Sequence, residues 1–173
     1  MTLRQWLCAT LFFLGLVVVA GTAAVRAQEA TAPVVHPRAT LALGPFPNVP
    51  TCLQSAAESG DPAKGPATFF TTFAPGCVVP WHWHTPDETI LAVSGSLRVE
   101  MKGGDKPVFL RGGDYAMMPS HHVHQARCVS TSPCTMFLHS SGIFDLHYVD
   151  ASGAEIPMSE AVKPASKSRK PAP

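Results

Sequence analysis

The stretch from Gly76 to Gly95, GCVVPWHWHTPDETILAVSG, decides the fold of this chain. It predicts a strand that carries His82 and His84, then a Thr-Pro-Asp turn and a second strand that begins at Glu88. Side chains alternate between the two faces of a strand, so the two histidines project to the same side. The hairpin returns the Glu88 carboxylate beside them. Imidazole and carboxylate groups on rigid strands suit a divalent transition ion, so this stretch predicts a metal site.

A second His-rich stretch supplies candidates for a fourth ligand. It reads GDYAMMPSHHVHQARC and runs from Gly113 to Cys128. A Gly-Asp turn, a short apolar run and a Pro-Ser break precede a predicted strand. His122 and His124 have the same parity on that strand, so either ring can face the first cluster, while His121 faces away.

The two stretches resemble the two sequence motifs of the cupin family. The first motif, G-x5-H-x-H-x3-E-x6-G, is matched from Gly76 to Gly95 with every gap kept. The second, G-x5-P-x-G-x2-H-x3-N, is matched at Gly113, Pro119 and His124. This resemblance implies an all-β fold, a single barrel of the jelly-roll or double-stranded β-helix type. It also implies one metal ion bound by four side chains: His82, His84, Glu88 and His124.

The chain departs from the second motif at two positions. His121 stands where the family usually has glycine, and Cys128 stands where it often has asparagine. Neither departure replaces a metal ligand of the family. The motif spacing favours His124 over His122, which places His121 and His122 at the rim of the predicted site. His139 and His147 lie further along the chain and either line the pocket or belong to the surface.

Strand alternation also predicts which side chains face away from the pocket. Val79, Trp81 and Trp83 have the opposite parity to the two histidines of the first motif. We expect them to pack between sheets or against another subunit, together with Leu91 and Val93 of the next strand. The resemblance adds a homodimer as a potential assembly.

Length and composition indicate one domain preceded by an export segment. An apolar run follows Arg4, so residues 1–27 are interpreted as a signal peptide, with an uncleaved anchor as the alternative. Residues 28–50 are expected to form a flexible arm and residues 51–156 the barrel. Residues 157–173 are expected to be a disordered basic tail. The formal net charge is +1, which does not favour nucleic-acid partners, and no stable membrane span is expected after cleavage.

Four cysteines follow the predicted signal peptide, and an even number in an exported chain is typical of disulfides. Cys128 and Cys134 flank a predicted hairpin, so they are the local choice of partners. Cys52 with Cys77 follows by elimination, although the sequence permits all three pairings. These features favour a periplasmic or secreted location.

Three imidazoles and one carboxylate leave open positions on a six-coordinate ion, which water or substrate can occupy. The resemblance implies Fe, Mn, Ni, Cu or Zn, with dioxygenation, isomerisation or decarboxylation among the reactions. The first hypothesis is therefore a metal-dependent, dioxygenase-like oxidoreductase of the cell envelope that acts on a small organic substrate. The second is a non-catalytic metal or small-molecule binding or sensor module. A purely structural role is the third.

Overall fold

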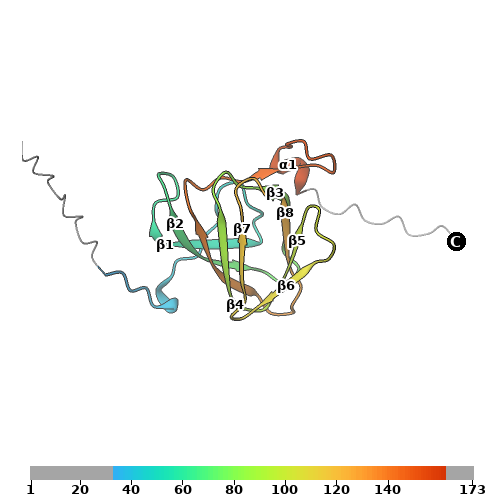
Figure 1. Cartoon of the computed structure of the whole chain (residues 1–173). Helices are drawn as coiled ribbons and strands as arrows, with labels where there is room; N and C mark the ends of the chain where they lie inside the picture. Colours follow the sequence, from blue (N-terminus) through green and yellow to red (C-terminus); the bar gives the residue numbers. More distant parts are fainter. Residues whose placement is uncertain (1–32, 163–173) are drawn as a thin grey trace, which may run out of the picture. The chain divides into compact units, whose positions relative to one another are not determined.

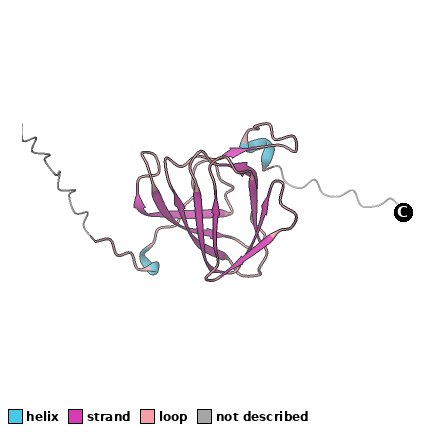
Figure 2. Ribbon diagram, in the orientation of Figure 1, coloured by secondary structure: helices cyan, strands magenta, loops and turns pink. Residues whose placement is uncertain are grey.

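The computed structural model describes residues 33–162, so the predicted signal peptide and most of the predicted tail lie outside the described residues. The described part of the chain is built almost entirely from β-strands (Figure 2). Their bounds are β1 Leu53–Gly60, β2 Ala67–Phe73, β3 Val78–Trp83, β4 Glu88–Ser94, β5 Ser96–Met101, β6 Val108–Arg111, β7 Tyr115–Met118, β8 His124–Cys128, β9 Cys134–Ser140 and β10 His147–Tyr148. A 3-10 turn, η1, spans Arg38–Thr40, and one helical turn, α1, spans Met158–Ala161.

The strands form two five-stranded antiparallel sheets (Figure 1). One sheet has the order β1-β2-β9-β4-β7, and the other has the order β10-β3-β8-β5-β6. From β7 to β10, successive strands alternate between the two sheets, so the chain crosses the core at each connection. This is the arrangement of a double-stranded β-helix, and the predicted all-β jelly-roll barrel is confirmed.

The core lies between the two sheets and is filled by alternate side chains. Leu97 and Val99 on β5 are each only 1% exposed, as the alternation predicts for an inward face. Arg98 and Glu100 on the same strand face outward and form an ion pair. Regular strands with this pattern hold the two sheets at a fixed spacing, which gives side chains at the barrel end a rigid support.

Strand β3 departs from regular alternation. Val79 is opposite Ala126 and His82 is opposite His124, so three steps along β3 match two steps along β8. This extra residue is a β-bulge, and it turns Val79, which is 4% exposed, toward the interior that the two histidines face. The prediction that Val79 faces away from the pocket is therefore wrong. The physical cause is Pro80, because a proline has no N–H for the ladder and β3 lies between two partners, β10 and β8.

The barrel extends beyond the expected boundaries at both ends. Val49 is 7% exposed, and Phe46 packs against the same core, although residues 28–50 were expected to be a flexible arm. Helix α1 occupies residues that were expected to belong to the tail, and Met158 also contacts the core. Between residues 33 and 162, no helix has the length and apolar character that crossing a membrane requires.

Two glycines of the first motif have different structural roles, which leads to a stability prediction. Both have left-handed backbone, with φ +76° at Gly76 and +80° at Gly95. A Cβ at Gly76 would contact nothing, whereas a Cβ at Gly95 would lie 2.8 Å from the Cα of Cys134. We expect Gly76→Ala to cost about 1 to 2 kcal/mol for the backbone alone. Gly95→Ala should cost a further 1 to 3 kcal/mol or so from the clash, and urea unfolding measures both. Equal losses of stability for the two substitutions would contradict the close approach of Cys134 to Gly95.

Candidate metal centre

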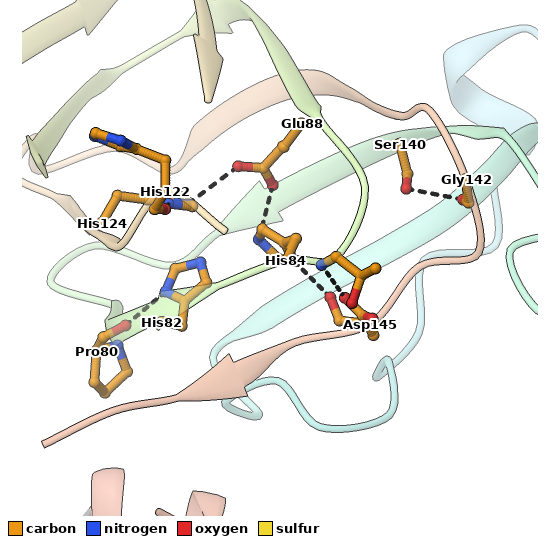
Figure 3. Close-up of polar contacts among 10 residues, drawn as sticks. Pro80, His82, His84, Glu88, His122, His124, Ser140, Gly142 and Asp145 are labelled. Atoms are coloured by element: carbon orange, nitrogen blue, oxygen red, sulfur yellow. Dashed lines mark hydrogen bonds and ion pairs between the residues drawn. The ribbon is translucent and has the colours of Figure 1, made fainter. Parts of the chain in front are cut away.

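Three imidazoles meet at one end of the barrel (Figure 3). His82 on β3 and His124 on β8 are direct cross-strand neighbours, with ring centroids 4.2 Å apart. His84 follows the last residue of β3, and its ring lies 4.9 Å from that of His82. Each ring is at most 4% exposed, and one nitrogen from each lies within 4.8 Å of the others. The structure therefore provides a histidine triad with the spacing to hold one metal ion.

The carboxylate of Glu88 reaches the same point from the opposite sheet. Glu88 is the first residue of β4 and is 5% exposed. Its two oxygens lie 3.5 Å from Nε2 of His84 and 3.2 Å from Nε2 of His124. In Figure 3 the carboxylate points toward both rings. All four predicted site residues are thus brought together.

Each imidazole of the triad is oriented by a backbone carbonyl. The Nδ1 atoms lie 2.6 Å from the carbonyl oxygen of Pro80 for His82, 2.5 Å from that of Asp145 for His84, and 2.9 Å from that of His122 for His124. A carbonyl only accepts hydrogen bonds, so each Nδ1 carries a proton and donates it. In a neutral ring, Nε2 then presents its lone pair to the centre of the site. His122, the alternative ligand of the sequence analysis, contributes its backbone carbonyl, which orients the His124 ring.

Two buried imidazole nitrogens without hydrogen-bond partners show that the site fits a cation. Nε2 of His84 and Nε2 of His124 are buried without a hydrogen-bond partner among residues 33–162. Their nearest polar neighbours are the Glu88 oxygens, which are also acceptors when the acid is ionised. Lone pairs facing lone pairs inside a protein are unfavourable unless a proton or a metal ion lies between them. A divalent transition ion has the ligand preferences that match this donor set.

The electrostatics of the site favour an ionised Glu88 and a neutral His82, the charge states in which these two residues can bind a metal. Burial alone raises the pKa of Glu88, but the surrounding imidazoles outweigh it and lower the pKa to about 2. Burial, together with the neighbouring rings of His124 and His84, lowers the pKa of His82 well below its usual value. Burial also works to lower the pKa of His124, yet Glu88 raises it on balance. In the absence of metal, Glu88 therefore favours a protonated His124 ring.

A network of short hydrogen bonds fixes the turn between His84 and Glu88. The N–H of Thr85 donates to Oδ1 of Asp145 at 2.7 Å, and the N–H of Asp87 donates to Oγ of Ser141 at 3.0 Å. Asp87 in turn accepts from the N–H of Ser120 at 2.7 Å. These bonds tie the turn to two neighbouring segments. The Thr-Pro-Asp sequence thus holds the two site residues that flank it in a fixed relation.

The remaining histidines lie outside the cavity of the triad. His121 has φ +60°, which explains why the motif usually has glycine at this position, and its ring stacks on Trp83 at 4.4 Å. His147 stacks on the other face of Trp83 at 3.9 Å. His139 is bonded to the hydroxyl of Thr68 on the outer face of the sheet. Trp83 therefore faces away from the cavity, as the alternation predicted.

A small, mostly apolar cavity of about 50 Å³ adjoins the four residues. Apart from them, the polar residues that line it are Ser55 and Thr71, whose hydroxyls bond to each other at 2.9 Å. The apolar lining comprises Phe46, Val49, Leu53, Phe69, Phe73, Val79, Ile90, Leu97, Val99, Ala126, Met136, Leu138, Phe144 and Leu146. A dry environment of this kind strengthens the interaction between a metal ion and its ligands.

The barrel and its buried histidine triad define a class of protein: a small β-barrel with a cluster of side chains that could hold a metal ion. The model of the cupin domain matches residues 69–140, which contain all four site residues. The barrel of this chain therefore contains a domain of the cupin superfamily. A search of curated proteins found no match.

Solved structures of low sequence identity share the fold. The polyketide cyclase RemF from Streptomyces resistomycificus is 15% identical with a TM-score of 0.61, over 75% of this chain and 92% of that protein. An RmlC-like cupin from Ralstonia eutropha is 18% identical with a TM-score of 0.59, over 74% and 79%. KdgF from Halomonas sp. is 20% identical with a TM-score of 0.52, over 64% and 94%. At these identities the similarity establishes the barrel alone.

Proposed function

We propose that this chain is a metal-dependent oxidoreductase of the cell envelope, dioxygenase-like, that acts on a small organic substrate. Its ion is one of Fe, Mn, Ni, Cu or Zn, held by four side chains: His82, His84, Glu88 and His124. The observation that carries the proposal is the pair of buried, unpartnered Nε2 atoms beside a carboxylate at the wall of an apolar cavity. A donor set of this kind leaves open coordination positions.

The size and polarity of the cavity support oxygen chemistry. About 50 Å³ exceeds the roughly 10 to 15 Å³ that one water molecule needs, and it is well below the roughly 150 Å³ of a site that takes benzene. Molecules of a few atoms, such as dioxygen, fit this space. When bound, a redox-active ion supplies electron exchange between oxygen and the substrate. The protein orients the ligands through their Nδ1 hydrogen bonds, and its apolar walls limit the entry of water.

Elemental analysis and oxygen uptake test this proposal. We expect protein isolated from its native compartment to contain about one redox-active ion per chain and to consume oxygen with a suitable organic substrate. A site that holds only zinc, together with no oxygen uptake across a panel of small organic compounds, would contradict an oxidoreductase.

One observation favours a non-catalytic binding module as the second candidate. Beyond the four proposed ligands, no side chain among the cavity residues titrates near neutral pH, and the two hydroxyls are bonded to each other. A reaction that needs a separate acid or base would lack one there. A ligand that binds tightly and is recovered unchanged would support this candidate over the enzyme.

The disulfides support a periplasmic or secreted location. Cys52 is bonded to Cys77 and Cys128 to Cys134, the two pairs that the sequence favoured. Such bonds persist in oxidising compartments. The proposed signal peptide at residues 1–27, which lies outside the described residues, would direct export there.

A homodimer is the assembly that the outer surface supports. Leu91 and Val93 on β4 are 46% and 45% exposed, and Tyr115 on the neighbouring β7 is 64% exposed. Apolar side chains gathered on one sheet face are typical of subunit contacts. Light scattering of the purified protein measures the assembly.

Metal occupancy is expected to fall as the pH drops below about 6. Protons compete with the ion for Nε2 of each histidine, so binding weakens as the rings become protonated. The raised pKa of His124 means that this ring takes a proton at a higher pH than an ordinary imidazole does. Glu88, with a pKa of about 2, stays ionised through this range and is not the cause of the loss. Metal content measured after dialysis at pH 4 to 8 tests this, and full occupancy at pH 4 would contradict an imidazole-dominated site.

A further inference from the structure

The cavity beside the histidine triad is too small for an organic substrate. Its volume of about 50 Å³ is about a third of that of an engineered cavity that holds benzene. An organic molecule must therefore have its main binding surface elsewhere, with at most one end reaching the proposed metal.

A wide cleft lies directly outside this cavity. It has a volume of about 700 Å³, within the range of about 300 to 1,000 Å³ typical of small-molecule sites. The side chains of Phe46, Phe144 and Leu146 line both the cleft and the cavity, so they form the wall between the two. The ring of Phe144 packs 5.2 Å from that of Phe46 and 5.3 Å from that of His84. Through Phe144, this wall contacts one of the proposed ligands, His84.

Two acidic residues line the cleft, together with the polar side chains of Asn48, His147 and Tyr148. Asp145 and Glu155 flank His147, with Asp145 Oδ2 3.4 Å from Nε2 and Glu155 Oε2 3.2 Å from Nδ1 of that ring. None of the described residues that line the cleft is Lys or Arg. Hydrogen bonds from Thr85 and His147 lower the pKa of Asp145 despite partial burial, which opposes them, so this carboxylate stays charged. The other lining residues are mainly apolar: Phe46, Pro47, Phe144, Leu146, Ile156, Pro157 and Met158.

We propose that this cleft binds the substrate and that the substrate is an organic cation with an apolar body, such as an aromatic or alkyl amine. Its ammonium group contacts the carboxylates of Asp145 and Glu155 from the open side of the cleft, beside the His147 ring that lies between them. Its apolar part lies against Phe46 and Phe144, toward the cavity. The two carboxylates attract a cation and repel an anion, and the apolar wall excludes a ligand that is polar throughout. This inference rests on the proposed function, because it names the substrate class of the same site.

Asp145 connects the cleft to the histidine triad. Its carboxylate faces the cleft and accepts from the N–H of Thr85, while its carbonyl accepts from Nδ1 of His84. A ligand held by the carboxylate is therefore attached to the same residue that orients one proposed metal ligand. Asp145 is a positioning residue in this arrangement. Glu155 has no contact with the triad, so its replacement tests the cleft alone.

Three probes of nearly equal size and different charge test the proposal by titration calorimetry. We expect benzylamine to bind at least about tenfold more tightly than benzyl alcohol, and benzoate to bind more weakly than either. Glu155→Gln should reduce the affinity for benzylamine by about tenfold and leave that for benzyl alcohol unchanged. Asp105→Asn, which removes an exposed carboxylate outside the cleft, is the matched control and should change neither.

Equal affinities for the three probes, or benzylamine binding that is insensitive to Glu155→Gln, would overturn the proposal. Metal content and oxygen uptake measured on the same samples separate this failure from that of the proposed function. A protein that holds a redox-active ion and consumes oxygen but does not prefer benzylamine refutes only the cationic substrate. Benzylamine binding that responds to Glu155→Gln supports the cleft even if the ion proves to be zinc.

Discussion

Replacing His84 with glutamine is expected to lower the affinity of the barrel for its metal ion by more than about 100-fold. Substitutions of groups that only orient a ligand already cost about 10- to 100-fold, and His84 is proposed to be a ligand itself. Its Nε2 is buried, has no hydrogen-bond partner in the described part of the chain, and lies 3.5 Å from Glu88. Glutamine keeps a polar side chain of similar length and limits the packing loss. Elemental analysis after dialysis measures the remaining metal.

A thermal shift gives a second readout of the same loss. A metal that binds only the folded state stabilises it by about 2.7 kcal/mol at 100 times its dissociation constant. The parent protein should therefore melt at a higher temperature when metal is added, and His84→Gln should not. His139→Gln is the matched control, since this ring is bonded to Thr68 on the outer sheet face. Metal retained by His84→Gln, or lost from His139→Gln, would refute the proposed ligand set.

The resemblance to the cupin motifs predicted the architecture and the meeting of four side chains, and local spacing accounts for three of the four. His82 and His84 are close in sequence, and the turn to Glu88 is short. His124 lies on a distant strand, and its position opposite His82 came from the family motif. The preferred disulfide pairs followed from the short loop between Cys128 and Cys134.

The error at Val79 shows the limit of a parity argument. Alternation assumes that every residue takes one step along the ladder, and the bulge between Val79 and His82 breaks this assumption. A signal was present, because proline inside a strand with two partners indicates a bulge. The bulge also has a use at the site, since the carbonyl of Pro80 accepts from Nδ1 of His82.

The groups that support the site could not be predicted because they depend on tertiary packing. Asp145 is 61 residues from His84 in sequence, and its carbonyl orients that ring. Phe46 lies before the first strand, yet it forms part of the wall between cavity and cleft. Neither contact follows from strand periodicity. A backbone carbonyl, moreover, has no residue type by which a motif could identify it.

Removing the disulfide between Cys52 and Cys77 is expected to destabilise the fold more than removing the one between Cys128 and Cys134. The sequence separations are 25 and 6 residues. Loop-closure entropy then gives costs of about 3.5 and about 2.2 kcal/mol. Such a loss is a large part of the roughly 5 to 15 kcal/mol of a typical domain. Urea unfolding of the two double alanine variants measures both.

The comparison between the two pairs is its own control. Each double variant loses two sulfur atoms, and the closed loops alone account for a difference of about 1.3 kcal/mol. The longer loop also has a functional consequence. Cys77 directly precedes β3, which carries His82, and Cys52 precedes β1, which follows the segment with Phe46. Breaking this bond should therefore weaken metal binding as well. Cys128 is the last residue of β8, which carries His124, so breaking the bond from Cys128 to Cys134 should also weaken it. A larger loss of stability for the shorter loop would contradict the entropic argument, and unchanged metal affinity in both variants would show that β3 and β8 are held by the sheet alone.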